Sequence, residues 1–87
     1  KISQYIKNEV ITMEYRYSVT HEIQDNGKKT CGIEVVAEDG ECWTVLQVVH
    51  EICSDEKKLE QLVNMCNKLK LDYIHLNDVI DDFLYDL

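Results

Sequence analysis

Residues 13–23 alternate between two kinds of side chain, which is the period-two pattern of a β-strand with one face in water. The inward set is Met13, Tyr15, Tyr17, Val19, His21 and Ile23. Two further β-rich runs follow at residues 30–38 and 41–52, each preceded by turn residues at 25–28 and 39–40. The N-terminal half therefore predicts a three-stranded antiparallel meander.

The register of the meander is predicted by matching the apolar faces of neighbouring strands. A two-residue turn at residues 39–40 sets Ile33 opposite Leu46 on one apolar face. In the first hairpin, a two-residue turn would join the apolar face of one strand to the polar face of the next. We therefore predict a three-residue loop at residues 26–28, with a left-handed glycine and with His21 opposite Ile33.

At Ser54 the period changes from two to 3.6, and Ser54 itself is expected to cap a helix. Apolar residues at helical spacing predict this helix over residues 54–71: Leu59, Leu62, Val63, Cys66 and Leu69. After a short break at residues 72–74, a second amphipathic stripe predicts another helix. Its members are Leu76, Val79, Ile80, Phe83, Leu84 and Leu87.

Two amphipathic helices need an apolar surface to cover, and one face of the sheet supplies it. The sequence thus predicts an α+β fold, a three-stranded antiparallel meander followed by two helices packed on one face. Since 87 residues leave room for one core, we expect a single domain over residues 13–87. The status of residues 1–12 as a leader stays open. Their apolar residues at spacings of three and four predict an additional N-terminal helix: Ile2, Tyr5, Ile6 and Val10.

The chain is acidic, with 17 acidic against nine basic side chains and a formal charge of -8. Such a surface repels nucleic-acid phosphates and anionic lipids, and no long uncharged apolar run is present, so we predict neither a nucleic-acid nor a membrane partner. Acidic residues concentrate on the last helix at Asp78, Asp81 and Asp82. They predict a secondary acidic surface for a basic partner, and the alternative is a solvated face that keeps a small domain soluble.

The four cysteines form no CxxC pair and no His/Cys cluster at zinc-ligand spacing, so we predict no metal site and no cofactor. An even count would suit two disulfides, but the first dozen residues lack the apolar run of a secretory signal. We therefore predict a cytoplasmic protein whose thiols are reduced and mostly buried. The cysteines are Cys31, Cys42, Cys53 and Cys66.

Catalytic chemistry has weak support in the sequence. His21, Cys31 and Cys42 supply a base and two thiols that would converge on one sheet face, but inward, buried thiols have raised pKa values and are inert. The common short motifs of nucleotide-binding, metalloprotease and hydrolase families are absent. His75 is expected to cap or pack against the last helix. We predict no catalytic residues.

The other face of the sheet is too apolar at its third strand to be left in water, and it carries Val36, Trp43, Val45 and Val49 beside charged residues. A tryptophan with a charged rim is typical of a protein interface. We expect a non-enzymatic interaction module whose patch is covered by the leader, by a second copy in a homo-oligomer, or by another protein. One alternative places Trp43 in the core. The other is a small ligand-binding domain or enzyme with a cleft between sheet and helices near His21, His50 or His75.

Several segments resemble a family of small proteins from clostridia and related Gram-positive bacteria, which is known as a domain of unknown function. They are residues 74–84 (IHLNDVIDDFL), 32–34 (GIE), 52–55 (ICSD) and 62–67 (LVNMCN). The resemblance spans most of residues 30–84 and leaves residues 1–12 outside. It implies a compact cytoplasmic protein with a short sheet and two helices, and it brings no established activity and no catalytic residues.

Overall fold

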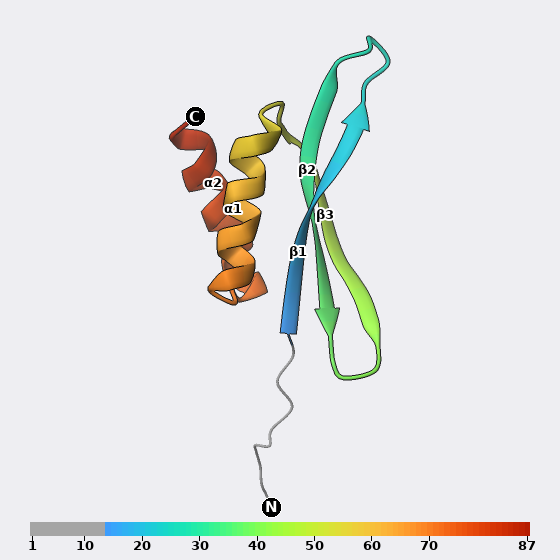
Figure 1. Ribbon diagram of the computed structural model, residues 1–87, viewed down its shortest axis with the longest axis vertical. Coiled ribbons are helices and arrows are strands. Elements are labelled where there is room, and N and C mark those ends of the chain that lie inside the picture. Colours follow the sequence, from blue (N-terminus) through green and yellow to red (C-terminus); the bar gives the residue numbers. More distant parts are fainter. Residues whose placement is uncertain (1–13) are drawn as a thin grey trace, which may run out of the picture.

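The computed structural model describes residues 14–87 (Figure 1). Three antiparallel strands form one sheet in the order β1-β2-β3, and two helices follow. The predicted α+β fold is confirmed, whereas the expected N-terminal helix lies outside the described residues. The elements are β1 (Glu14–Ile23), β2 (Lys29–Glu38), β3 (Trp43–Cys53), α1 (Glu56–Lys68), the short 3-10 helix η1 (Tyr73–His75) and α2 (Leu76–Tyr85).

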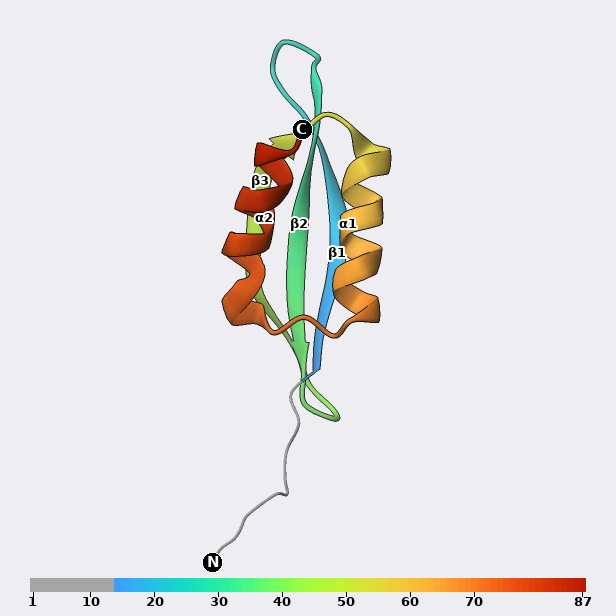
Figure 2. The same cartoon turned by 90° about the vertical axis from the view of Figure 1, so that its left-hand side faces the viewer.

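Both helices lie on the same side of the sheet, which makes a two-layer structure (Figure 1). Seen from the helix side, α1 runs along β1 and α2 lies in front of β3, with β2 visible between them (Figure 2). Apolar side chains of both layers meet in a single core. Its buried members are Tyr17, Cys31, Ile33, Val35, Ile52, Leu59, Val63, Cys66, Leu76 and Ile80.

The first hairpin has a longer loop than predicted. Ile23 pairs with Lys29, so the loop comprises residues 24–28, and His21 pairs with Cys31 rather than with Ile33. The prediction was wrong by two residues because hydrogen bonds inside the loop close it earlier, at Gln24, whose N–H donates to the Lys28 carbonyl at 2.8 Å. The loop still has an odd number of residues, so the inward faces of β1 and β2 meet as expected. Gly27 has the predicted left-handed conformation, with φ of 83°.

The second hairpin departs further from the prediction. Its loop comprises residues 39–42, and β3 then contains an irregularity at which Val36 pairs with Val45 but Val35 pairs with Gln47. The extra residue in β3 is Leu46. Beyond it, the residues of β3 exchange faces, so the predicted pairing of Ile33 with Leu46 is wrong. Alternation could not reveal this bulge, because apolar residues occupy both faces of the strand.

The exchange of faces corrects one predicted interface residue. Val49 pairs with Ile33, which is fully buried, and packs against the core on the helix side of the sheet. Val48 pairs with Glu34 on the opposite side. Val49 is therefore not part of the uncovered face on which the sequence analysis placed it.

The strands approach one another closely where β3 contains its second irregularity, opposite Cys31 and Ile33. A Cβ at Gly32 of β2 would overlap the backbone carbonyl oxygen of Val49 and lie 2.9 Å from the Thr20 hydroxyl oxygen. Glu51, in the same part of β3, has a positive φ of 54°. Only glycine at position 32 leaves room for the β3 backbone to lie this close to β2.

Helix α1 begins one residue later than predicted. Its N-cap is Asp55, not Ser54, and the Asp55 carboxylate accepts a hydrogen bond from the Lys58 backbone N–H at 3.1 Å. Because the helix ends at Lys68, the predicted stripe member Leu69 lies beyond it and is exposed. The earlier stripe members at positions 59, 63 and 66 are buried as predicted.

Helix α1 is joined to β1 by a pair of polar contacts that we call the Asn67 latch. The Tyr17 backbone N–H donates to Asn67 Oδ1 and Asn67 Nδ2 donates to the Tyr17 carbonyl, both at 2.8 Å. The side-chain amide thus takes the place of a neighbouring strand at the outer edge of β1. The Tyr17 hydroxyl also donates to the Leu71 carbonyl at 2.7 Å, and burial raises the pKa of Tyr17 to about 12.

Candidate functional site

The side of the sheet away from the helices carries an exposed aromatic patch. No described helix lies over this side (Figure 1). Trp43 is 59% exposed and Val45 is 57% exposed, while Val36 lies between Arg16 of β1 and Val45 of β3 and is half-buried. Trp43 is therefore not in the core, which was the alternative considered from the sequence. We call the set Arg16, Val36, Glu38, Trp43 and Val45 the tryptophan face.

Arg16, on the outer strand opposite to Trp43, contacts two other residues of the tryptophan face. The Arg16 guanidinium carbon lies 5.1 Å from the centroid of the Trp43 ring, and Arg16 Nη2 lies 3.9 Å from Glu38 Oε2. Since β1 and β3 are the outer strands, Arg16 reaches across β2 to make the first contact. The indole is held in place while most of its surface stays accessible.

The surroundings of the tryptophan face are acidic. Glu14 pairs with Glu38 across β1 and β2, and Glu34 follows on the same side of β2. We call Glu14, Glu34 and Glu38 the acidic rim. At the far end of this side, His50 of β3 contacts the Glu22 carboxylate of β1, again across β2. Arg16 alone among these strand residues carries a permanent positive charge.

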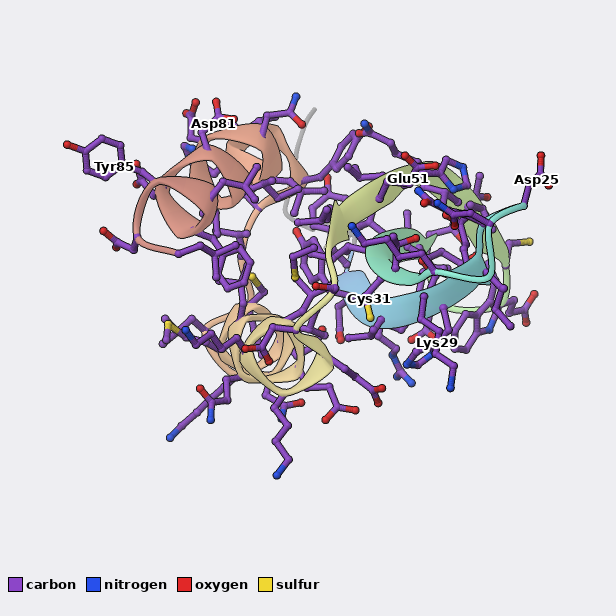
Figure 3. All side chains as sticks on the ribbon, turned by 90° about the horizontal axis from the view of Figure 1, so that it is seen from above. Asp25, Lys29, Cys31, Glu51, Asp81 and Tyr85 are labelled. Atoms are coloured by element: carbon purple, nitrogen blue, oxygen red, sulfur yellow. The ribbon has the colours of Figure 1, made fainter. Side chains whose placement is uncertain are left out.

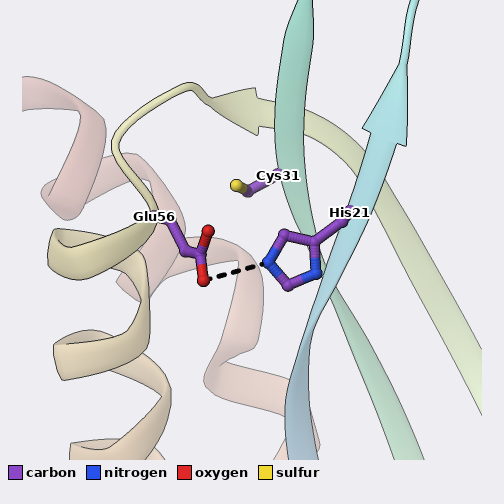
Figure 4. Close-up of side chains that lie close together, drawn as sticks. All are labelled: His21, Cys31 and Glu56. Carbon is purple, nitrogen blue, oxygen red and sulfur yellow. Dashed lines mark ion pairs between the residues drawn. The ribbon is translucent and has the colours of Figure 1, made fainter.

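A second cluster lies on the helix side, where His21 of β1, Cys31 of β2 and Glu56 of α1 point toward one another (Figure 4). One ligand atom from each residue lies within 4.8 Å of the others, and His21 Nε2 is 3.2 Å from Glu56 Oε2. Cys31 is buried, whereas the other two are more than half exposed. Burial raises the pKa of the Cys31 thiol, and the nearby Glu56 carboxylate raises it further. We call these three residues the His21 cluster.

The thiols lie in different surroundings from those expected for a nucleophile and base. Cys42 is exposed in the loop between β2 and β3, so it does not join His21 and Cys31 as the sequence analysis considered. All four cysteines are free, and Cys31 and Cys66 are the buried ones. The raised pKa of Cys31 agrees with the prediction of an unreactive thiol.

A groove of about 430 Å³ lies beside the His21 cluster, between β1 and α1. The alternative function requires a cavity that contains an exposed histidine with a second polar group within reach. His21 lines this groove, but its partner Glu56 is not one of the lining residues. The other two candidate histidines lie elsewhere, since His50 contacts Glu22 and His75 precedes α2 without a side-chain capping bond. The lining residues are Tyr17, Ser18, Val19, His21, Glu60, Val63, Asn64 and Asn67.

The predicted acidic surface lies on the outside of α2. Asp78, Asp81 and Asp82 are all exposed. Asp81 and the neighbouring Tyr85 point away from the sheet (Figure 3). These carboxylates have no ion-pair partner among residues 14–87. Their role as a docking surface stays a prediction.

The family model described as "Family of unknown function (DUF6514)" matches residues 2–86. The chain belongs to this family. The DUF6514 match includes nearly all of residues 1–12, so the expectation that the leader lies outside the family was wrong. No curated protein and no solved structure matches the chain. Within the part of this DUF6514 member that the structure describes, no helix has the length and apolar character to cross a membrane.

Sequence reasoning missed two residues of this DUF6514 member that the structure brings into its candidate sites. Glu56 lies in the first turn of α1, where acidic residues are common, and nothing in its sequence position indicates His21. Arg16 is one of the polar residues that alternate with apolar ones along β1. The only available signal was that Arg16 and Trp43 both lie on the side of the sheet opposite the helices.

Proposed function

We propose that this DUF6514 member is a non-enzymatic protein-binding module that docks a partner on the tryptophan face. The observation that carries the proposal is the exposure of Trp43 and Val45 on the side of the sheet that neither helix covers. Tryptophan and arginine, which lie together in this patch, are among the residues that contribute most to binding at protein interfaces. The patch is built on strands, so little ordering is needed when a partner binds.

The charge around the patch favours a partner of a particular chemistry. The acidic rim on β1 and β2 adjoins the apolar residues of β3, and this arrangement complements an apolar side chain next to Lys or Arg. A second copy of this chain fits less well. In a symmetric pair each acidic rim would approach its own copy, and each chain carries a formal charge of -8. We therefore assign the partner as a different, basic protein segment, in the cytoplasm.

Trp43 is the only tryptophan of the chain, so its fluorescence reports directly on the patch. The probes are two synthetic peptides with the same central leucine, flanked by lysines in one and by glutamates in the other. We expect the lysine-flanked peptide to change the Trp43 emission, with an affinity that falls as salt is raised. The glutamate-flanked peptide should leave the emission unchanged.

Two variants distinguish specific binding at the tryptophan face from non-specific binding elsewhere on the protein. Calorimetry with the lysine-flanked peptide should show at least a tenfold weaker affinity for Trp43→Ser, while the matched control Ile74→Ser, an exposed apolar residue on the helix side, should bind as the parent chain does. Equal binding by the two variants, or no binding by the parent chain, would refute the proposal. Sedimentation should show a monomer. A dimer that Trp43→Ser dissolves would replace the basic partner by a second copy.

A further inference from the structure

We propose that the His21 cluster, together with Cys53, binds a divalent transition-metal ion of the zinc type. The site lies on the helix side of the sheet and is separate from the tryptophan face. It contradicts the expectation from sequence spacing that the chain has no metal site. Spacing along the chain failed because the donors come from four different elements or their ends, β1, β2, β3 and α1.

The distances within the His21 cluster suit a single ion. In a tetrahedral zinc site, nitrogen and oxygen donors at roughly 2.0–2.1 Å from the metal are separated by about 3.3 Å. His21 Nε2 and Glu56 Oε2 are 3.2 Å apart. The third donor, Cys31, has its sulfur within 4.8 Å of both other ligand atoms. With a zinc–sulfur bond of about 2.3 Å, a tetrahedral site places the sulfur about 3.6 Å from the other donors, so the Cys31 side chain closes on the ion when it binds.

The fourth donor is provided by the pairing of β2 with β3. Cys53 lies directly opposite Cys31, and cross-strand partners present their side chains on the same face of a sheet. The Cys53 thiol lies 3.6 Å from the Asp55 carbonyl oxygen and has no other described partner. Cys53 is not one of the three residues of the His21 cluster, so our proposal requires its sulfur to rotate toward Cys31. The donor set then comprises two sulfurs, one nitrogen and one oxygen.

The chemistry of this donor set selects the ion. Thiolate and imidazole together favour zinc over calcium or magnesium, which prefer oxygen donors alone. Carboxylates of Asp55 and Glu60 lie near enough to Cys31 to influence its thiol, and their negative charge favours a bound cation. On binding, each thiol forms a sulfur–metal bond and releases its proton to the solvent. No oxidant or reductant is needed.

Titration of the full, reduced chain with Zn²⁺ in a calorimeter tests the site. We expect one equivalent to bind, with a rise in the thermal unfolding temperature because only the folded chain assembles the four donors. Titration with Co²⁺ should produce the near-ultraviolet charge-transfer absorption of thiolate–cobalt bonds, which a nitrogen and oxygen site lacks. The absence of a stoichiometric complex, or a cobalt complex without this absorption, would overturn the proposal.

Matched variants assign the ligands. His21→Gln and Glu56→Gln alter exposed side chains and should each weaken Zn²⁺ binding at least tenfold with the fold retained, as judged by circular dichroism. His50→Gln changes another histidine that contacts a carboxylate, that of Glu22, and it should bind as the parent chain does. Equal affinities of His21→Gln and His50→Gln would refute the cluster as a metal site.

The cysteine variants have their own controls. Cys31→Ser and Cys53→Ser should lose binding or the charge-transfer absorption, while Cys66→Ser, the other buried thiol, should keep both. Parent affinity in Cys53→Ser would overturn the four-donor site. Trp43→Ser should bind Zn²⁺ normally, so failure of the metal site and failure of the tryptophan face are distinguishable.

Discussion

The Asn67 latch makes a quantitative prediction about how the helical layer is held to the sheet. We consider Asn67→Asp, which preserves the size and shape of the side chain. One carboxylate oxygen still accepts from the Tyr17 backbone N–H, but the group that donates to the Tyr17 carbonyl is lost. A negatively charged oxygen then stands where Nδ2 lies, 2.8 Å from the carbonyl oxygen. The variant exchanges an attraction for a repulsion at one atom.

The magnitude follows from the two bonds of the latch. A hydrogen bond contributes about 0.5–1.5 kcal/mol net, and a buried polar group left without a partner costs about 1–3 kcal/mol. The backbone groups of Tyr17 are buried, since the whole residue is only 2% exposed. We therefore expect Asn67→Asp to lower the free energy of unfolding by about 2–3 kcal/mol. For a domain of this size, that corresponds to a fall of roughly 10–20 °C in the unfolding temperature.

Circular dichroism during urea and thermal unfolding measures this change. The control is Asn64→Asp, which introduces the same charge on the same helix at an exposed position. It should change the free energy of unfolding by less than about 0.5 kcal/mol. A second readout is hydrogen exchange of the Tyr17 amide, which should accelerate in Asn67→Ala because its acceptor is removed. A difference below about 0.5 kcal/mol between the two aspartate variants would show that the latch does not stabilise the fold.

Three further predictions concern the backbone and buried hydroxyls. Gly32→Ala should lower the free energy of unfolding in urea by about 3 kcal/mol or more, since the added Cβ overlaps the Val49 carbonyl oxygen. Gly27→Ala, whose Cβ has open space, should cost only about 1–2 kcal/mol, through the positive φ at that position. Equal costs would contradict the close approach of β3 to Gly32. Thr30→Val should raise the unfolding temperature, because the buried Thr30 hydroxyl has no hydrogen-bond partner among residues 14–87, and a fall would show that it has one. Burial raises the pKa of Tyr17 to about 12 in the folded chain, against about 10 in the unfolded chain. The free energy of unfolding is therefore unaffected by this group below pH 10 and falls by on the order of 2–3 kcal/mol between pH 10 and 12. Tyr17→Phe should abolish this alkaline loss in urea titrations, and an unchanged loss would place its origin elsewhere.

The sequence predicts the elements well because each has a clear period. The alternation of β1 and the apolar stripes of α1 and α2 depend on which face is buried, and burial follows directly from the pattern. The pairing register of the strands is harder to predict. In β3, apolar residues on both sides of Leu46 conceal a bulge, so the strand fits two registers equally well in sequence. The structure has the register in which Ile33 pairs with Val49.

The candidate sites were predicted in part. Exposure of Trp43 follows from its position in the strand pattern, and the structure places Val36 and Val45 beside it. The contact with Arg16 was not predictable, because it crosses an intervening strand and depends on the curvature of the sheet. The same holds for the meeting of His21 with Glu56. Two residues 35 positions apart in the chain approach each other only after α1 has packed along β1.

The Asn67 latch also limits how copies of this chain can join edge to edge. A sheet with two open outer strands can add neighbours on both sides and so grow into a filament. Here the outward N–H and C=O of Tyr17, in the middle of β1, are already occupied by a side chain of the same molecule. Lateral growth through β1 would first have to displace that amide. Strand addition at β3 alone terminates after one pairing, so edge-to-edge association of this fold cannot continue into an endless polymer.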